Sequence, residues 1–302
     1  MLNLDYFVVD VFSATPLQGN PLAVVMNTCG LTTERMQAIA REFNLSETTF
    51  VERRAAEVER AEGVRVRIFT ARVELPFAGH PTLGTACVLK ANAPETVESG
   101  TVTLALNVGL VPVRFEQGDA GSTGWFGEMT QPNPEFGAEL DRREVARLTG
   151  LAVDDLDPAL PPQVVSTGTA FAIVVLRTTA ALAGLSVKQS EATAWLSERG
   201  ARWFYVLGPD PDQNQGPAQW RARMQFDGGE DPATGSAAGC AISYLVARSA
   251  VPSDTRVRLC QGAEIDRPSE LLLSARRESA RVRDVRVAGS TVLVARGRLF
   301  LP

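Results

Sequence analysis

Histidine is nearly absent from this chain, which has one histidine and four cysteines among its 302 residues. The cysteines lie far apart, at Cys29, Cys87, Cys240 and Cys260, and form no CxxC pair. We therefore expect neither a zinc site nor another metal centre. No apolar run approaches the roughly 18 residues of a membrane-spanning helix, and no Walker or GxGxxG motif supports nucleotide binding. These absences predict a protein that works without a metal, a cofactor or a membrane.

Charge of either sign is also modest. The formal net charge is −5, with 22% charged and 45% hydrophobic residues, which is typical of a globular protein. This balance gives no electrostatic reason to expect a nucleic-acid partner or an anionic membrane. The first residues, MLNLDYFVVDVF, lack the basic region and cleavage site of a signal peptide and predict a strand. With no disulfide pattern, we expect free thiols and a cytoplasmic location.

The sequence contains an internal repeat. RIFTARVELPFAGH (67–80) aligns without gaps with RMQFDGGEDPATGS (223–236), and the Arg, Glu, Pro and Gly coincide. A weaker echo relates GNPLAVV (19–25) to GTAFAIV (168–174). Because the two echoes have the same order and nearly equal offsets, the sequence predicts two similar halves of roughly 150 residues. The join is expected at the QPNP turn that begins at Gln131.

Most other segments predict strands, because they are rich in β-branched residues or alternate in polarity. The pair RVRDVRVAGSTVLVARGRL (281–299) predicts a hairpin whose turn is AGS. Amphipathic helices are predicted at Thr33–Phe43, Arg142–Leu148 and Lys188–Arg199. Pro81–Leu89 and Ala237–Ala247 carry no charge, so these two helices are expected to be buried on all sides. Each half then wraps a sheet or barrel around one buried helix.

Both copies of the motif lead into the start of a buried helix. Pro81 fits the first helical position, which leaves His80 as the N-cap, and Ser236 occupies the equivalent place. If the halves face each other, two helix N-termini converge on one cleft, and their backbone N–H groups favour an anion such as a carboxylate. A helix N-terminus also disfavours imidazolium. His80 is therefore expected to be neutral at pH 7 and able to donate or accept a proton.

Each of these residues also has a purely structural interpretation. His80 and Ser236 can be simple caps, Asp231 can begin an Asp-Pro turn, and Glu47 in NLSETTFV can close a capping box. A serine hydrolase is an alternative because Ser, His and Asp all occur in these motifs, although TGSAAG is not GxSxG. Carboxylates with one imidazole and no metal fit proton transfer better.

Four segments together, FSATPLQGNPLAVV, NLSETTFV, ELPFAGHPTLGTA and GEDPATGSAAGCAISYLV, resemble the PhzF-like family, which is named for phenazine biosynthesis. The resemblance implies an α+β fold similar to that of diaminopimelate epimerase. It has two pseudo-symmetric halves, each a mostly antiparallel barrel-like sheet around a central helix, with the active site between them. It also implies that the last strands return to the first half, which gives domains of 1–130 with 286–302 and of 131–285. Family members are often homodimers, so a homodimer is expected.

The resemblance further implies a cofactor-free isomerase or epimerase. Glu47 matches the glutamate that acts as general acid/base in the phenazine enzyme, and His80, Asp231 and Ser236 match the other polar residues of that site. A small carboxylate-bearing metabolite is the expected substrate. Its expected binding residues are Asn20, Ser46, Gly79, Pro81, Thr234, Gly235 and Ala237. A serine-type hydrolase using Ser236 and His80, or a non-catalytic metabolite-binding protein, remains the alternative.

Three features of the sequence depart from the patterns of this family or of the diaminopimelate epimerases. Diaminopimelate epimerases use two cysteines at the helix starts, and Ala78 and Thr234 stand at the aligned positions, so a two-thiol racemase is not expected. The loop before the second acidic motif is the shortened QFDGGEDP, and Asp266 stands where glycine is usual in the C-terminal element QGAEIDRPS. Either difference is expected to alter the substrate or the rim of the cleft.

Overall fold

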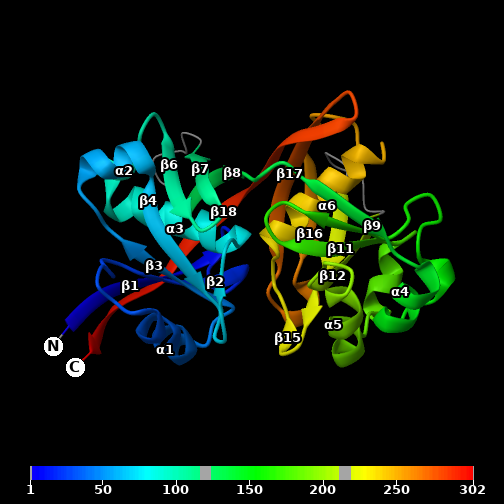
Figure 1. Cartoon of the computed structure of the whole chain (residues 1–302), viewed down its shortest axis with the longest axis horizontal. Helices are drawn as coiled ribbons and strands as arrows, with labels where there is room; N and C mark the ends of the chain where they lie inside the picture. Colours follow the sequence, from blue (N-terminus) through cyan, green and yellow to red (C-terminus); the bar gives the residue numbers. More distant parts are fainter. Residues whose placement is uncertain (1, 116–123, 211–218, 302) are drawn as a thin grey trace. The chain divides into compact units, whose positions relative to one another are not determined.

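The computed structural model describes residues 2–115, 124–210 and 219–301, which divide into two compact units (Figure 1). Unit 1 is Met1–Thr130 with Ala288–Pro302, and unit 2 is Gln131–Val287. The chain therefore passes from one unit to the other twice, after Thr130 and after Val287. The sequence-based boundary at 285/286 and this second crossing both lie inside strand β18 (Arg281–Leu301).

Unit 1 is a closed ring of strands around a central helix. The strand order is β1-β2-β3-β4-β6-β7-β8-β18, and β18 pairs back onto β1. The strands are β1 (Leu2–Val11), β2 (Asn20–Val25), β3 (Glu47–Glu52), β4 (Val64–Phe69), β5 (Glu74–Leu75), β6 (Thr101–Leu106), β7 (Gly109–Phe115) and β8 (Gly124–Thr130). The helices are α1 (Thr33–Phe43), α2 (Ala56–Glu62), the central α3 (Gly79–Asn92) and the short 3-10 helix η1 (Pro94–Thr96).

Unit 2 repeats this plan, with the first residues of β18 at one end of the strand order and β9 at the other. Its other strands are β9 (Glu135–Glu139), β10 (Gln163–Ser166), β11 (Ala170–Val175), β12 (Trp203–Pro209), β13 (Gln219–Arg223), β14 (Gln225–Phe226), β15 (Gly229–Glu230), β16 (Val257–Gln261) and β17 (Ser269–Glu278). Its helices are α4 (Arg142–Thr149), α5 (Gln189–Ser197), the central α6 (Gly235–Ala247) and the 3-10 helices η2 (Val153–Asp155), η3 (Thr179–Gly184) and η4 (Ala263–Ile265).

Strand pairing confirms the repeat that the sequence predicts. In unit 1 the pairs β1–β2, β2–β3, β3–β4, β4–β6 and β6–β7 alternate between antiparallel and parallel. In unit 2 the pairs β10–β11, β11–β12, β12–β13, β13–β16 and β16–β17 show the same alternation. Helix α5 follows β11 as α1 follows β2, and α6 lies between β13 and β16 as α3 lies between β4 and β6. The two halves are therefore copies of one topology.

The repeated Arg and Glu form the same ion pair in each unit. Arg67 contacts Glu74 through two hydrogen bonds of 2.9 and 2.6 Å, and Arg223 contacts Glu230 through two of 2.8 and 2.6 Å. Such a two-bond pairing of a guanidinium with a carboxylate fixes both side chains. In each unit it ties the strand before the central helix to the segment that leads into that helix. The identities in the aligned motifs thus mark a structural clamp.

Both central helices are buried, as their uncharged sequences predict. In α3 every residue from Gly79 to Leu89 is buried, and in α6 every residue from Gly235 to Val246. Glycine makes this close packing possible: a Cβ placed on Gly84 would lie 2.7 Å from side-chain carbons of Leu22 and Val11. Burial on all sides fixes the helix within its unit, so the first turn of each helix is held in place.

One local prediction is wrong. The AGS segment (288–290) forms no turn, because β18 runs unbroken for 21 residues. Its first part pairs with β17 in unit 2, and its last part pairs with β1 from Leu2↔Leu301 to Val11↔Thr291. Small residues in AGS occur where the strand passes between units, and the carbonyl of Ser290 accepts hydrogen bonds from the backbone N–H groups of Phe12 and Ser13.

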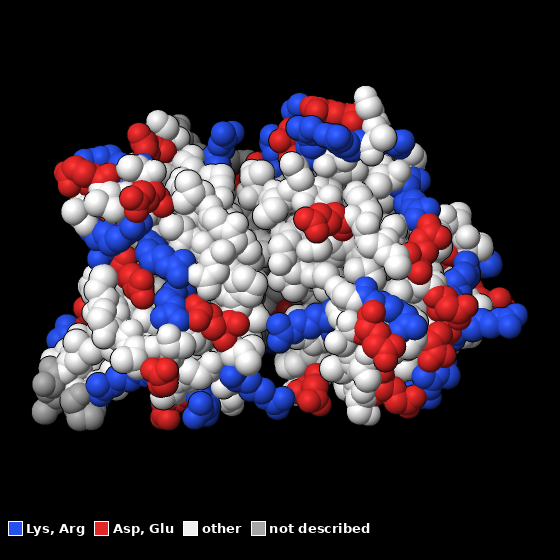
Figure 2. All heavy atoms as spheres, viewed as in Figure 1, with Lys and Arg blue, Asp and Glu red and all other residues white. Residues whose placement is uncertain are grey.

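The surface in Figure 2 shows acidic and basic side chains side by side. On the β17–β18 hairpin, for example, Arg276 contacts Asp254, Glu278 and Asp284. Among the described residues, no helix is long and apolar enough to cross a membrane.

Candidate active site

In unit 1 the predicted site residues come together at the start of two parallel strands and of helix α3. Glu47 is the first residue of β3 and lies opposite Leu22 of β2 in the parallel register. Asn20 begins β2 and is fully buried, and Ser46, which is half-buried, directly precedes Glu47. The left-handed conformation of Asn44, at φ 50°, ends α1 and turns the chain into β3. The fold therefore gathers residues that lie far apart in the sequence.

Both helix starts lie earlier than the sequence predicts. Helix α3 begins at Gly79 with Ala78 as its N-cap, and α6 begins at Gly235 with Thr234 as its N-cap. His80 is therefore not the N-cap but the second residue of its helix, and Ser236 has the same place in α6. Because a glycine opens each helix, the first turn forms without a side-chain cap. The correction puts His80 and Ser236 among the first-turn residues, whose backbone N–H groups have no partner within the helix.

His80 and Glu47 face each other. Nε2 of His80 lies 3.4 Å from Oε2 of Glu47, but the contact does not have the geometry of a hydrogen bond. The imidazole donates a hydrogen bond to the backbone carbonyl of Pro21. Because Nε2 faces Glu47, Nδ1 makes this bond and carries the proton of the neutral ring. The lone pair of Nε2 therefore points toward the carboxyl group of Glu47.

Burial keeps the His80 ring neutral. Only 3% of the residue is exposed, and this desolvation lowers the pKa of His80 to about 3, although the hydrogen bond to Pro21 acts to raise it. The neutral state that the sequence predicts is confirmed, and its main cause is burial. At neutral pH, Nε2 is therefore a hydrogen-bond acceptor that faces an acidic side chain.

In unit 2 the predicted residues lie at the start of α6. Asp231 is 9% exposed and lies shortly before Gly235, the first residue of the helix. Its Oδ2 accepts a 2.6 Å hydrogen bond from the hydroxyl of Thr234. Gly235, Ser236 and Ala237 form the buried first turn of the helix. In the aligned motif, Asp231 stands where unit 1 has Leu75. The carboxylates of the two units therefore come from different elements, because Glu47 begins β3 and Asp231 lies just before α6.

Two buried glutamines that hold this helix start are absent from the sequence-based prediction. Nε2 of Gln131 donates to the carbonyl of Gly235 at 2.9 Å. Nε2 of Gln261 donates to the carbonyl of Asp231 at 2.7 Å. Both glutamines occur in segments that the sequence singles out, the QPNP turn and the QGAEIDRPS element, but side-chain amides that bond to backbone carry no local pattern. Asp266 in that element has φ 56°, a left-handed conformation that favours glycine and tolerates aspartate.

The buried cysteines cannot serve as acid/base groups. Burial raises the pKa of Cys87, in α3, and of Cys240, in α6, to about 12 in each case. Thiols with such a pKa stay protonated at neutral pH and are poor nucleophiles. The helix-start positions themselves hold Ala78 and Thr234. Among the described residues, no group of three or more His, Cys, Asp or Glu is placed to hold a metal ion.

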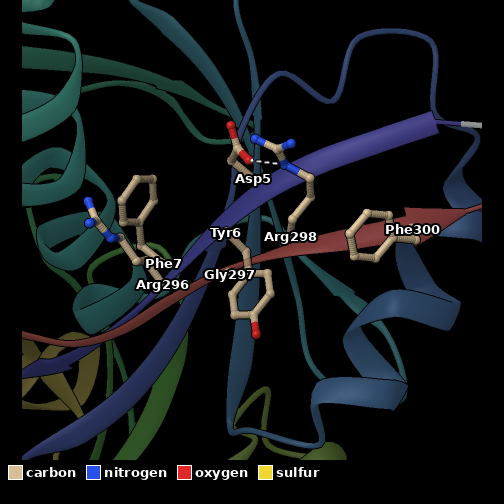
Figure 3. Close-up of a pocket in the computed structure, with 7 residues that line it drawn as sticks. All are labelled: Asp5, Tyr6, Phe7, Arg296, Gly297, Arg298 and Phe300. Atoms are coloured by element: carbon tan, nitrogen blue, oxygen red, sulfur yellow. Dashed lines mark hydrogen bonds and ion pairs between the residues drawn. The ribbon is translucent and has the colours of Figure 1, made fainter.

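A separate hollow on unit 1 has a cavity volume of about 510 Å³ and lies between β1 and β18 (Figure 3). It is lined by Asp5, Tyr6, Phe7, Arg296, Gly297, Arg298 and Phe300. Its charged groups include Arg298, which contacts Asp5 at 2.8 Å. None of the predicted site residues lines it, and it contains no carboxylate facing a neutral imidazole. The residues that the sequence predicts as a site lie elsewhere, at the start of α3 in unit 1 and at the start of α6 in unit 2.

Comparison with known proteins identifies the family and the fold of the chain. Residues 9–297 match the model of the family described as phenazine biosynthesis-like protein, PhzC-PhzF. The trans-2,3-dihydro-3-hydroxyanthranilate isomerase of Pseudomonas aeruginosa is 36% identical over 299 residues, which cover 98% of this chain and 99% of the relative. The crystal structure of a PhzF-family protein from Bacillus anthracis covers 100% of both chains with a TM-score of 0.84 and 25% identity. That of a predicted epimerase from Pseudomonas aeruginosa covers 99% of this chain and 100% of the other, with a TM-score of 0.82 and 32% identity.

These matches extend over the whole fold and include both helix starts, so the predicted family and its α+β, epimerase-like fold are confirmed. With a family model that matches nearly the full length and a repeat visible in both sequence and strand pairing, this chain belongs to the phenazine biosynthesis-like PhzF family.

Proposed function

We propose that the protein is an isomerase that moves a proton between carbon atoms of a small carboxylate-bearing substrate, without a cofactor, with Glu47 as the general acid/base. The observation that carries this proposal is the contact between Glu47 and the neutral, buried His80. A general base must hold the proton that it takes from the substrate. The lone pair of Nε2 can accept a hydrogen bond from the protonated carboxyl group, so it stabilises the form of Glu47 that has taken up a proton.

The proton balance of the proposed reaction closes on the chain's own groups. The Glu47 carboxylate takes a proton from one substrate carbon, and the electron pair left behind is delocalised within the substrate. The protonated Glu47 then donates a hydrogen bond to Nε2 of His80. Because burial disfavours the charged imidazolium and holds the pKa of His80 far below its usual value, the ring does not take the proton and it stays on Glu47. Glu47 returns it to a second carbon, and the enzyme regains its starting state.

The first turns of the two central helices are suited to the substrate carboxylate. Backbone N–H groups at a helix N-terminus attract an anion, and the hydroxyl of Ser236 adds a side-chain donor in the first turn of α6. We propose that Glu47 with His80 in unit 1, and Asp231 with Ser236 in unit 2, are the groups that act on substrate. Asn20, Ser46, Gly79, Pro81, Thr234, Gly235 and Ala237 line these helix and strand starts and are proposed to bind it.

A serine hydrolase fits the geometry less well. In a catalytic triad the histidine Nδ1–H is held by a carboxylate and Nε2 faces the serine hydroxyl. In this protein Nδ1 bonds to the neutral carbonyl of Pro21, and Nε2 faces Glu47. The ring is therefore oriented toward an acidic group and not toward a nucleophile.

Deuterium exchange tests the proposal directly. The first compound to incubate with the enzyme in D₂O is trans-2,3-dihydro-3-hydroxyanthranilate, which the name of the Pseudomonas aeruginosa relative gives as its substrate, followed by other small unsaturated carboxylates. Wild-type enzyme is expected to incorporate deuterium at carbon, and Glu47→Gln to lose about 10²- to 10⁴-fold in rate. Glu52→Gln, at the other end of strand β3, is the matched control and is expected to keep the wild-type rate. Unchanged exchange in Glu47→Gln would sink the proposal.

A further inference from the structure

Asp231 is the end point of a buried chain of hydrogen bonds that begins at Tyr205. The hydroxyl of Tyr205 donates to Oε1 of Gln261 at 2.9 Å. Nε2 of Gln261 donates to Oγ1 of Thr234 at 3.0 Å, and the Thr234 hydroxyl donates to Oδ2 of Asp231 at 2.6 Å. Tyr205 is fully buried, and Gln261, Thr234 and Asp231 are at most 9% exposed. Water therefore has little access to these bonds.

The direction of each bond in the chain is fixed by a group that can only donate. The backbone N–H of Thr234 points at one end of the Gln261 amide at 3.1 Å, so that end is the carbonyl oxygen Oε1. The other end is then the NH₂ group, which donates to the Asp231 carbonyl and to the Thr234 hydroxyl. Since the hydroxyl accepts that bond, its one hydrogen is directed at Asp231 Oδ2.

Tyr205 keeps this direction over a wide pH range. Burial raises the pKa of Tyr205 well above its usual value, and the nearby charge of Asp231 acts in the same direction. The phenol therefore stays protonated and remains a donor. The amide of Gln261 is saturated, because Oε1 accepts two bonds and Nε2 donates two. Its orientation has no alternative of comparable energy.

The backbone holds Gln261 against the Asp231 segment. Gly262, the next residue, has φ +81°, and a Cβ placed there would lie 2.5 Å from the carbonyl oxygen of Pro232. The backbone N–H of Asp231 donates to the carbonyl of Met224 at 2.9 Å. Glycine at 262 thus permits a close backbone approach, and the approach sets the position of the amide side chain.

We propose that Thr234 and Gln261 are positioning residues for the proposed reaction, which hold Asp231 in one orientation and make its Oδ2 a hydrogen-bond acceptor. The Thr234 hydrogen occupies one lone pair of Oδ2 and so stabilises the ionised form of Asp231. The orientation of the carboxylate relative to substrate is therefore set by Thr234 and Gln261. This inference rests on the proposed function for its catalytic meaning, but its geometric content does not depend on it.

Thr234→Val and Thr234→Ser separate this role from simple packing. Valine has the shape of threonine without the hydroxyl, and serine keeps the hydroxyl with less bulk. Losing a hydrogen bond to a charged group is expected to lower kcat by about 10- to 100-fold in Thr234→Val, with KM changed by less than kcat. Thr234→Ser is expected to restore most of kcat, and Gln261→Met to behave like Thr234→Val.

The matched control is Thr149→Val. Thr149 is also a fully buried threonine of unit 2. Its hydroxyl bonds to the carbonyl of Val145 within α4, away from the hydrogen bonds that link Tyr205 to Asp231. It is expected to leave kcat unchanged. Equal losses in Thr234→Val and Thr234→Ser would overturn the proposal and assign Thr234 a packing role, and wild-type kcat in Thr234→Val would overturn it as well.

Failure of this inference differs from failure of the proposed function. If Thr234→Val keeps the wild-type exchange rate while Glu47→Gln is inactive, the function stands and the inference fails. If the wild-type protein shows no exchange with any compound, a crystal structure of Thr234→Val decides the inference instead. An Asp231 carboxylate in a new orientation supports the positioning role, and one in its wild-type orientation refutes it.

Discussion

One identifiable contribution to acid destabilisation of this protein is expected from the only histidine in the chain. His80 is neutral and buried in the folded state, where its pKa is about 3, and it titrates near 6.5 when the chain unfolds. Because the folded-state pKa is lowered, the unfolded state binds a proton that the folded state does not. Its neutral form therefore imposes no cost above pH 6.5, and stability falls progressively as the pH drops from 6.5 toward 3.

The magnitude follows from the width of this window. Well below 6.5 each pH unit costs about 1.4 kcal/mol. Because the unfolded histidine is already half protonated at pH 6.5, the His80 contribution lowers the free energy of unfolding by about 2.3 kcal/mol between pH 6.5 and 4.5. His80→Gln removes the titrating group, and the carboxylates that also titrate in this range are common to both proteins. The difference between wild type and His80→Gln is therefore expected to change by this amount over the two pH units.

Two assays check the expectation. Urea unfolding of both proteins at pH 8, 6.5, 5.5 and 4.5 measures the difference in the free energy of unfolding. In the wild type, the NMR signal of the ring Cε1–H has no other histidine to overlap it, and its chemical shift is expected to stay constant from pH 8 to 5. A titration midpoint near or above 6.5 would refute the reasoning. It would mean that a charged Glu47, 3.4 Å away, stabilises imidazolium more than burial disfavours it.

Three further outcomes are expected. Glu230→Ala leaves the guanidinium of Arg223 nearly buried without its partner, and urea unfolding of unit 2 is expected to show a loss of about 3 to 5 kcal/mol. Gly239→Ala places a Cβ within 2 Å of Oε1 of Gln131 and is expected to lower the free energy of unfolding by about 1 to 3 kcal/mol. A double-mutant cycle is expected to show a smaller loss in a Gln131→Ala background. Iodoacetamide at pH 8 is expected to label exposed Cys29 in the folded protein and the two buried helix cysteines only after unfolding, as peptide mass mapping will show.

The sequence predicts the architecture well because the repeat and the uncharged helices are local patterns. Thr33–Phe43 is a helix with the predicted bounds, and Pro81–Leu89 and Ala237–Ala247 lie within the two central helices. The AGS turn is wrong because a small-residue segment has the same composition in a turn and in a strand that passes between units. Composition cannot separate the two when the deciding partners, β1 and β8, lie far away in the sequence.

The sequence likewise predicts some features of the candidate site and misses others. Glu47, His80, Asp231 and Ser236 belong to motifs that a sequence can reveal, although their roles and the predicted homodimer and cytoplasmic location stay predictions. Both helix starts are predicted two residues late because Pro81 fits the first helical position and Ser236 fits a cap, whereas these helices begin at Gly79 and Gly235. The glutamines could not be found, because an amide that bonds to backbone leaves no periodic signal. Gln261 reaches Asp231 across 30 positions of sequence.

The single long strand β18 also dictates the order in which the protein forms during synthesis. Unit 1 is closed by the last part of β18, which pairs with β1 from Leu2↔Leu301 onward, so its ring stays open until that strand has been synthesised. Unit 2 is one continuous segment, Gln131–Val287, and is fully synthesised first. Domains usually fold from the N-terminus onward as they leave the ribosome. In this protein the second-encoded unit is complete first, while the unit that carries Glu47 and His80 waits with an unpaired edge for its final strand.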